Sequence, residues 1–181
     1  MTRTAPHQLL VMGVAGCGKS TLAAELARAL GCSLIEGDDH HPAQNQEKMR
    51  HGLALDDADR APWLSHLGTL LANAGNGAVL TCSALKRRYR DQLRAAAPSL
   101  AIVFIDITPA QARARVAARA DHLFPASLVD SQFEALEPPL GEPGVLRVDA
   151  AQPVATQLDA ILRWLGHRAG QTPHPSEEKL S

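Results

Sequence analysis

The stretch GVAGCGKST, residues 13–21, constrains the fold of this chain more than any other part of the sequence. It matches the pattern G-x-x-x-x-G-K-[ST], a glycine-rich turn that lies between a strand and a helix. The apolar run QLLVMG precedes it, and STLAAELARALG follows with leucines four residues apart and a final glycine as a stop signal. A second apolar run, SLIEGD, comes next. We therefore expect the order strand, glycine loop, helix, strand.

The residue types of this loop predict a binding site for a nucleotide phosphate, rather than a flexible glycine loop on the surface. The glycines allow backbone angles at which successive N–H groups turn toward an anion, and the following helix points its positive end at the same place. Lys19 adds a charge for the β- and γ-phosphates, and the Ser20 hydroxyl is placed to ligate Mg²⁺. The residues expected to form the phosphate site are Gly13, Ala15, Gly16, Cys17, Gly18, Lys19, Ser20 and Thr21.

Composition limits the other classes of function. A chain of 181 residues with 45% hydrophobic residues suits one domain, expected over residues 1–165, followed by a flexible tail over 166–181. The net charge of −1 and the 3% aromatic content give no basis for binding nucleic acid. No apolar stretch is long enough to span a bilayer, so no membrane association is expected. Three cysteines without a C-x-x-C pair are typical of a reducing cytoplasm.

Alternating patterns predict an α/β fold with a parallel sheet covered on both faces. The strand candidates are residues 8–13, 33–36, 78–82, 101–106 and 144–148, with helical patterns between them. In such a sheet, the ligand crevice lies at the carboxyl ends of the strands. The phosphate loop follows the first strand and is therefore expected at that crevice.

The segment EGDDHHPAQNQEKMRHGLALDDADRAPWL, residues 36–64, is unusually polar for a crossover connection. Asp38 is the carboxylate nearest the predicted strand end, where it can bind an acceptor hydroxyl and take its proton. His40 and His41 follow it, and the alternative for this pair is a local role in a turn before Pro42. A zinc site is not expected, because no second cluster of ligands has suitable spacing.

The basic segment VLTCSALKRRYRDQLR begins with the third strand candidate. We expect its helix to start two residues before Lys86, which places Lys86 at the crevice, where it suits an anionic acceptor. Arg90 and Arg94 share one stripe with Lys86 and are expected on a solvated helix face, while Arg87 can pair with Asp91.

The segment AQARARVAARADHLFPASLVDSQFEALEPP predicts a helix, a break near residues 121–125 and a second helix. Arg115 and Arg119 are four residues apart and project from one helix face. This arrangement is typical of a lid, here about residues 115–137, that closes over phosphates and neutralises charge on the transferring group. The alternative is that both arginines are surface charges on an alanine-rich helix.

Four motifs together resemble the gluconokinase family, small ATP-dependent kinases related to shikimate and adenylate kinases. They are GVAGCGKS, GDDHHPAQNQEKMRHGLALDDADRAPWL, CSALKRRYRD and SQFEALEPP, and they extend over most of residues 9–165. The resemblance implies transfer of the ATP γ-phosphate to the 6-hydroxyl of D-gluconate, giving 6-phosphogluconate. It also implies a three-layer P-loop kinase fold with a five-stranded parallel sheet, helices on both faces, a helical lid and usually a homodimer.

The resemblance also implies roles for individual residues. ATP and Mg²⁺ would be held by Gly16, Gly18, Lys19, Ser20 and Thr21, with Ser20 on the metal. The gluconate site would be lined by Asp38, His41, Arg60 and Lys86. Arg115 would stack on adenine opposite the loop at residues 149–153, which contains Pro153, and Arg119 would serve phosphate. The catalytic residues would thus be Lys19, Asp38 and Arg119.

One feature departs from the family pattern, and two other functions stay open. The lid has Asp121-His122 where the family commonly has Gly-His, which is expected to alter lid closure and ATP affinity rather than the reaction. A related kinase that acts on another small acceptor, such as shikimate or a nucleoside monophosphate, is one alternative. A regulator that binds nucleotide without turnover is the other.

Overall fold

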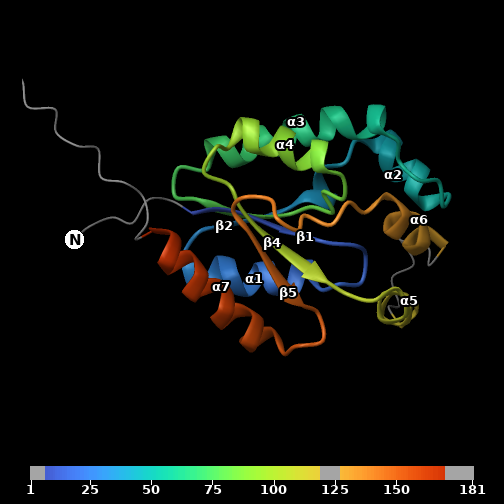
Figure 1. Ribbon diagram of the computed structural model, residues 1–181. Helices are drawn as coiled ribbons and strands as arrows, with labels where there is room; N and C mark the ends of the chain where they lie inside the picture. The colour runs from blue at the N-terminus through green and yellow to red at the C-terminus, as the bar shows by residue number, and fades with distance from the viewer. Residues whose placement is uncertain (1–6, 119–126, 170–181) are drawn as a thin grey trace, which may run out of the picture.

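A computed structural model describes residues 7–118 and 127–169 of the chain (Figure 1). Five parallel strands form one sheet in the order β2-β3-β1-β4-β5. The strands are β1 Gln8–Met12, β2 Ser33–Glu36, β3 Ala78–Thr81, β4 Ala101–Asp106 and β5 Val145–Asp149. The predicted α/β class and parallel sheet are confirmed, and every strand begins and ends within one residue of its prediction.

Helices cover both faces of the sheet and gather at one of its ends (Figure 1). The helices are α1 Lys19–Leu30, η1 Gly37–His40, α2 Ala43–Arg50, α3 Asp57–Asn73, α4 Arg87–Ala96, α5 Pro109–Ala117, α6 Ser127–Ala135 and α7 Val154–Ala169. Helices α1 and α7 lie on one face, and α3 and α4 lie on the other. Helices α2, α5 and α6 lie beyond the carboxyl ends of the strands, which is the end where the phosphate loop was expected.

The central strand shows why the strands appear as unbroken apolar runs in the sequence. Leu9 and Val11 pack into the core on the α1 side, and Leu10 and Met12 pack into the core on the α3 side. All four are completely buried. A strand buried on both faces needs apolar residues at every position, because successive side chains point to opposite faces.

The helix that follows β3 differs from its prediction in two respects. The helix α4 begins at Arg87 rather than near residue 84, so the predicted start is wrong. Ala84 has a φ of 44°, which is incompatible with a helix. Arg90 is also not solvated as expected: its side chain is 1% exposed and forms an ion pair with Glu142.

The guanidinium of Arg90 joins three segments of the chain. It donates to the carbonyl oxygens of Ala84 at 2.9 Å and Leu85 at 3.0 Å, and to that of Glu137 at 3.0 Å. Its Nε lies 3.1 Å from a carboxylate oxygen of Glu142. Burial opposes ionisation of Glu142, but hydrogen bonds from Arg90 and Arg94 outweigh it and hold the pKa of this carboxyl below its usual value. The pair therefore ties the loop after β3 to the segment that enters β5.

The last helix is longer than the sequence indicated. Helix α7 continues to Ala169, so residues 166–169, which were assigned to the tail, belong to the helix. Arg168 lies over the ring of Trp164, with its guanidinium carbon 5.0 Å from the ring centre, and this contact supports the last turn. The rest of the expected tail lies outside the described residues.

We predict that Arg90→Met destabilises the fold strongly, because it leaves the buried Glu142 carboxylate and three carbonyl groups without their partner. Loss of one partner of a buried ion pair costs about 3–5 kcal/mol. Arg94 still contacts Glu142 at 2.9 Å, so the lower end of this range is expected. Urea denaturation would measure the change in the free energy of unfolding.

Arg87→Met is the matched control, because Arg87 lies on the same helix with its side chain 68% exposed beside Asp91. An exposed ion pair contributes at most about 1 kcal/mol. Equal losses in the two variants would contradict a structural role for the Arg90–Glu142 pair.

Candidate active site

The phosphate loop connects β1 to α1 and has the conformation that its glycines predict. Gly13, Gly16 and Gly18 have φ angles of 146°, 81° and 105°, which residues with a Cβ rarely adopt. Gly16 also packs closely: a Cβ at this position would lie 2.9 Å from the carbonyl oxygen of Ala112 in α5. The loop is therefore both turned by its glycines and pressed against the first helix of the expected lid.

Lys19 lies along the inside of this loop. Its Nζ donates to the carbonyl oxygens of Gly13 at 3.0 Å and Val14 at 3.1 Å. Cys17 is a buried residue of the loop, whereas Ser20 and Thr21 are exposed in the first turn of α1. The ammonium group is thus held at the mouth of the loop by two carbonyl groups.

Glu36, which the sequence analysis did not single out, accepts hydrogen bonds from two hydroxyl groups near the phosphate loop. The Ser20 hydroxyl donates to its carboxylate at 3.1 Å, and the Thr81 hydroxyl donates to it at 2.6 Å. The following residue must be glycine, because a Cβ on Gly37 would lie 2.2 Å from the carbonyl oxygen of Thr81. This close approach of the chain segments after β2 and β3 places the Glu36 carboxylate beside Ser20.

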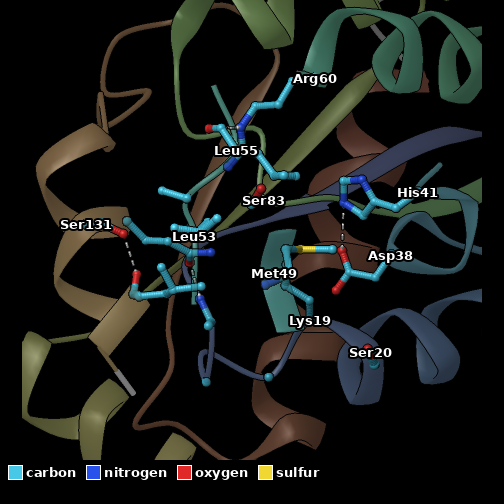
Figure 2. A pocket seen from close by; sticks show the side chains of 16 residues that line it. Lys19, Ser20, Asp38, His41, Met49, Leu53, Leu55, Arg60, Ser83 and Ser131 are labelled. Atoms are coloured by element: carbon cyan, nitrogen blue, oxygen red, sulfur yellow. Dashed lines mark hydrogen bonds and ion pairs between the residues drawn. The ribbon is translucent and has the colours of Figure 1, made fainter. Parts of the chain in front are cut away.

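Asp38 lies on the next turn, η1, and His41 comes directly after that turn. The Asp38 side chain is 83% exposed, and His41 Nε2 lies 3.9 Å from its Oδ1 (Figure 2). The His41 ring is buried and stacks on Trp63, with ring centres 3.9 Å apart. The pKa of His41 is lowered to about 4, mainly by burial; Asp38 opposes this shift, and Arg60 adds a smaller lowering effect. His41 is therefore neutral at pH 7.

The other histidine of the pair, His40, lies near His66, with ring centres 5.3 Å apart. The described residues contain no group of three or more histidine, cysteine, aspartate or glutamate side chains arranged to hold a metal ion. A magnesium ion that is held mainly by nucleotide phosphates and water needs no such group.

One pocket joins the phosphate loop to the segment after β2 (Figure 2). Its polar wall combines Lys19 and Ser20 from the loop with Asp38, His41 and Arg60 from the segment that follows β2. The rest of the lining is Ala15, Gly16, Gly18, Met49, Leu53, Ala54, Leu55, Ser83, Leu128, Ser131 and Gln132. Eight of the residues expected in the two binding sites therefore line a single pocket.

Lys86, which was expected at the acceptor site, does not line this pocket. Its Nζ lies 3.2 Å from Asp57 Oδ1, and Asp57 also accepts hydrogen bonds from Arg88 and from the Tyr89 hydroxyl. Asp57 was not singled out from the sequence. Arg60 lies on the pocket side of this cluster, and its Nε donates to the Leu55 carbonyl oxygen at 3.3 Å.

Arg115 of α5 lies next to the loop that follows β5. It donates to the carbonyl oxygen of Ala150 at 2.8 Å and to that of Cys17 at 3.4 Å. Helix α5 is thereby connected to both the phosphate loop and residues 149–153. Arg119 and the predicted break at residues 121–125 lie outside the described residues.

Gln132 of α6 is a further residue that the sequence analysis did not assign to the site. Its Oε1 accepts a hydrogen bond of 2.7 Å from the backbone N–H of Ala15, in the phosphate loop. Its position in the second helix of the expected lid was the only signal for it in the sequence. Helices α5 and α6 therefore each contact the phosphate loop directly.

We predict that the buried neutral His41 makes stability depend on pH. Its pKa of about 4 in the folded state lies below the ordinary value of 6.5, so the unfolded chain binds a proton first as the pH falls. Stability is then lost between about pH 6.5 and pH 4, by about 2 kcal/mol between pH 7.5 and pH 5. Chemical denaturation at these two pH values would measure this loss.

The control is His41→Phe, which keeps an aromatic ring against Trp63 but removes the titrating group. Its free energy of unfolding should change by much less than that of the wild type over the same pH range. An equal change in both proteins would show that another group is responsible.

The sequence of this chain is similar to those of known proteins. Residues 9–139 match a family model described as "AAA domain". Gluconokinase from Gluconobacter oxydans is 45% identical over 161 residues, which is 87% of this chain and 90% of that protein. Thermosensitive gluconokinase from Escherichia coli is 38% identical over 155 residues, 83% of each chain.

A solved structure shows the same similarity. The crystal structure of a gluconokinase from Sinorhizobium meliloti superposes with a TM-score of 0.84 at 43% identity, and the match covers 93% of this chain and 96% of that one. Identity at this level over nearly the full length of the proteins establishes more than a shared fold. The chain belongs to the gluconokinase family.

Proposed function

We propose that this protein transfers the γ-phosphoryl group of ATP to the 6-hydroxyl of D-gluconate, giving 6-phospho-D-gluconate and ADP. The observation that carries the proposal is the single pocket lined both by the phosphate loop and by Asp38, His41 and Arg60. Family membership supports the same reaction, because the curated relatives are named gluconokinases. The direct test is ADP release from ATP, measured with and without D-gluconate.

The donor end of the pocket suits ATP. The turned N–H groups of the loop and the amino end of α1 favour an anion, and the Lys19 ammonium lies at the loop's mouth. We propose that Arg115 packs against adenine together with the loop that contains Pro153, since its guanidinium already contacts Ala150. Arg119 is proposed to neutralise phosphate charge from the lid.

The residues around Ser20 fit Mg²⁺. The Ser20 hydroxyl and the Glu36 carboxylate are hard oxygen ligands, and they already lie 3.1 Å apart. Ser20 would hold the ion, and Glu36 would accept hydrogen bonds from its water ligands. When bound, Mg²⁺ neutralises negative charge on the β- and γ-phosphates.

The acceptor end of the pocket suits a hydroxylated anion. Arg60 supplies a positive charge in the pocket for a carboxylate, and Lys86 adds positive potential behind it while it is paired with Asp57. Asp38 is exposed in the pocket and can accept a hydrogen bond from the reacting hydroxyl. A sugar acid carries both a carboxylate and hydroxyl groups, which favours it over an uncharged sugar.

The reaction then requires positioning and charge stabilisation. The 6-oxygen of gluconate forms a bond to the γ-phosphorus, and the bond from that phosphorus to the bridging oxygen of ADP breaks. The hydroxyl proton passes to Asp38. Lys19 stabilises the charge on the phosphoryl oxygens as they move between donor and acceptor.

The same ADP assay tests the competing functions. ADP release that is stimulated by shikimate or a nucleoside monophosphate, and not by gluconate, would assign the protein to a related kinase. Tight ATP binding without stimulation by any acceptor would indicate a regulator. The acidic and basic side chains that line one wall of the pocket favour a kinase, since a regulator needs no acceptor site.

Two further properties are part of the proposal. The three cysteines are free, as a reducing cytoplasm requires, and we propose that the enzyme acts there. We also propose a homodimer, on the basis of the family resemblance alone. Among the residues that the structure describes, no helix has both the length and the apolar character needed to cross a membrane.

We predict that Lys19→Ala abolishes phosphoryl transfer and leaves the fold intact. The Lys19 ammonium is needed most where charge develops on the transferring group. The variant should show near-native circular dichroism and a kcat reduced by much more than tenfold, a barrier change above about 1.4 kcal/mol. Arg28→Ala, at the exposed far end of the same helix, is the control and should retain activity. A kcat above a tenth of the wild-type value in Lys19→Ala would rule out this role.

A second prediction separates acceptor from donor. Asp38→Asn keeps the size of the side chain but removes its charge, so gluconate-dependent turnover should fall by roughly 10²–10⁴-fold. ATP binding, measured by calorimetry, should be unchanged. Asp39→Asn is the matched control, because Asp39 is exposed on the same turn and does not line the pocket. A collapse of ATP affinity in Asp38→Asn would instead place Asp38 with the magnesium ion.

A further inference from the structure

The peptide group between Val14 and Ala15 is held from both sides by side chains. Its carbonyl oxygen accepts a hydrogen bond of 3.1 Å from Lys19 Nζ, and its N–H donates one of 2.7 Å to Gln132 Oε1. The C=O and N–H of a trans peptide point in opposite directions. Lys19 and Gln132 are therefore separated by a single peptide plane, although they come from α1 and α6. Gln132 is thus a direct contact of the phosphate loop.

Helix α6 holds Gln132 firmly. Val129 is completely buried in the core on the α1 side, and Phe133 packs against the same core. Asp130 forms an ion pair with Arg113, which joins α6 to α5. A side chain on a helix fixed in this way keeps a defined direction. The contact with Ala15 is therefore part of the packed structure.

The other end of the carboxamide is available to a ligand. Oε1 is occupied by the Ala15 N–H, and this is the one hydrogen bond that the Gln132 side chain forms with the described part of the chain. Gln132 lines the pocket together with Lys19 and Asp38. In Figure 2, its neighbour Ser131 lies on the opposite side of the pocket from Asp38. The two N–H donors of Gln132 are thus placed at the junction between the phosphate loop and the acceptor site.

An acceptor hydroxyl needs a donor of this kind. A hydroxyl group carries one hydrogen and two lone pairs, and Asp38 as a carboxylate accepts hydrogen bonds only. The oxygen of the same hydroxyl group is held in place only if another group donates to it. A neutral amide donor suits a neutral hydroxyl oxygen, whereas the phosphates already have Lys19 and the N–H groups of the loop.

We propose that Gln132 is a positioning residue for the acceptor. Its Oε1 stays on the Ala15 N–H, and its Nε2 donates to a hydroxyl oxygen of the sugar acid at the point of phosphoryl transfer. The lid helix α6 thereby sets the distance between the acceptor and the phosphate loop. This inference rests on the proposed function and adds a residue that binds the hydroxylated part of the substrate.

Two substitutions separate the two ends of the carboxamide. Gln132→Met keeps the length of the side chain and removes both hydrogen bonds. Gln132→Glu keeps an oxygen that can accept from Ala15 but removes the N–H donors. Glu134→Gln is the matched control, because Glu134 is exposed on the same helix and does not line the pocket. Melting temperatures of all three variants verify that the fold is intact.

The measurements are the KM for D-gluconate, kcat, and the Kd of a non-hydrolysable ATP analogue by calorimetry. We expect kcat/KM for gluconate to fall about tenfold or more in Gln132→Met and at least as much in Gln132→Glu. The Kd of the ATP analogue should change less than threefold in Gln132→Met. Glu134→Gln should match the wild type in every measurement.

Three outcomes would overturn the proposal. Wild-type kinetics in Gln132→Glu with a loss in Gln132→Met would show that the side chain only braces the phosphate loop. Weaker binding of the ATP analogue with an unchanged KM for gluconate would assign Gln132 to the donor. A wild-type protein with no gluconate-stimulated ADP release would overturn the proposed function, and this inference with it.

Discussion

A parallel sheet buried on both faces is the constraint on which the site depends. In such a sheet the carboxyl ends of all strands meet at one edge, so the segments that follow them become neighbours. The phosphate loop follows β1, Glu36 ends β2, and Ser83 comes just after β3. Residues from distant parts of the sequence thus line one pocket without any long loop to bring them together. The order β2-β3-β1 puts the acceptor segment and the phosphate loop on the two sides of β3.

This constraint also explains which features were predictable from the sequence. Strands buried on both faces appear as apolar runs, and each predicted strand agrees with the structure to within one residue. The loop glycines at 13, 16 and 18 have positive φ angles, as their spacing indicated. The start of α4 was predicted wrongly because Ala84, a good helix former, adopts a φ of 44° in the loop after β3. A local strain of this kind leaves no trace in helix propensity.

The polar contacts that complete the site were not predictable, because each joins residues far apart in the chain. Arg90 and Glu142 are 52 residues apart, and Ala15 and Gln132 are 117 residues apart. In the sequence, Arg90 belongs to a basic helical stripe, and such a stripe is typical of a solvated face. Its burial depends on an acidic partner that only the fold supplies. Glu36 was missed for the same reason, since its neighbours Ser20 and Thr81 come from other elements.

The charges in the pocket explain why a buried histidine lies beside Asp38. A charged His41 would neutralise the carboxylate and weaken it as an acceptor for the hydroxyl proton. Stacking on Trp63 removes His41 from water, and burial lowers its pKa to about 4. The ring therefore fills space and orients the turn without adding a charge. Because burying an ionisable group opposes stability at acid pH, an apolar ring would serve packing alone better. The polar Nε2, 3.9 Å from Asp38, is what an apolar ring would lack.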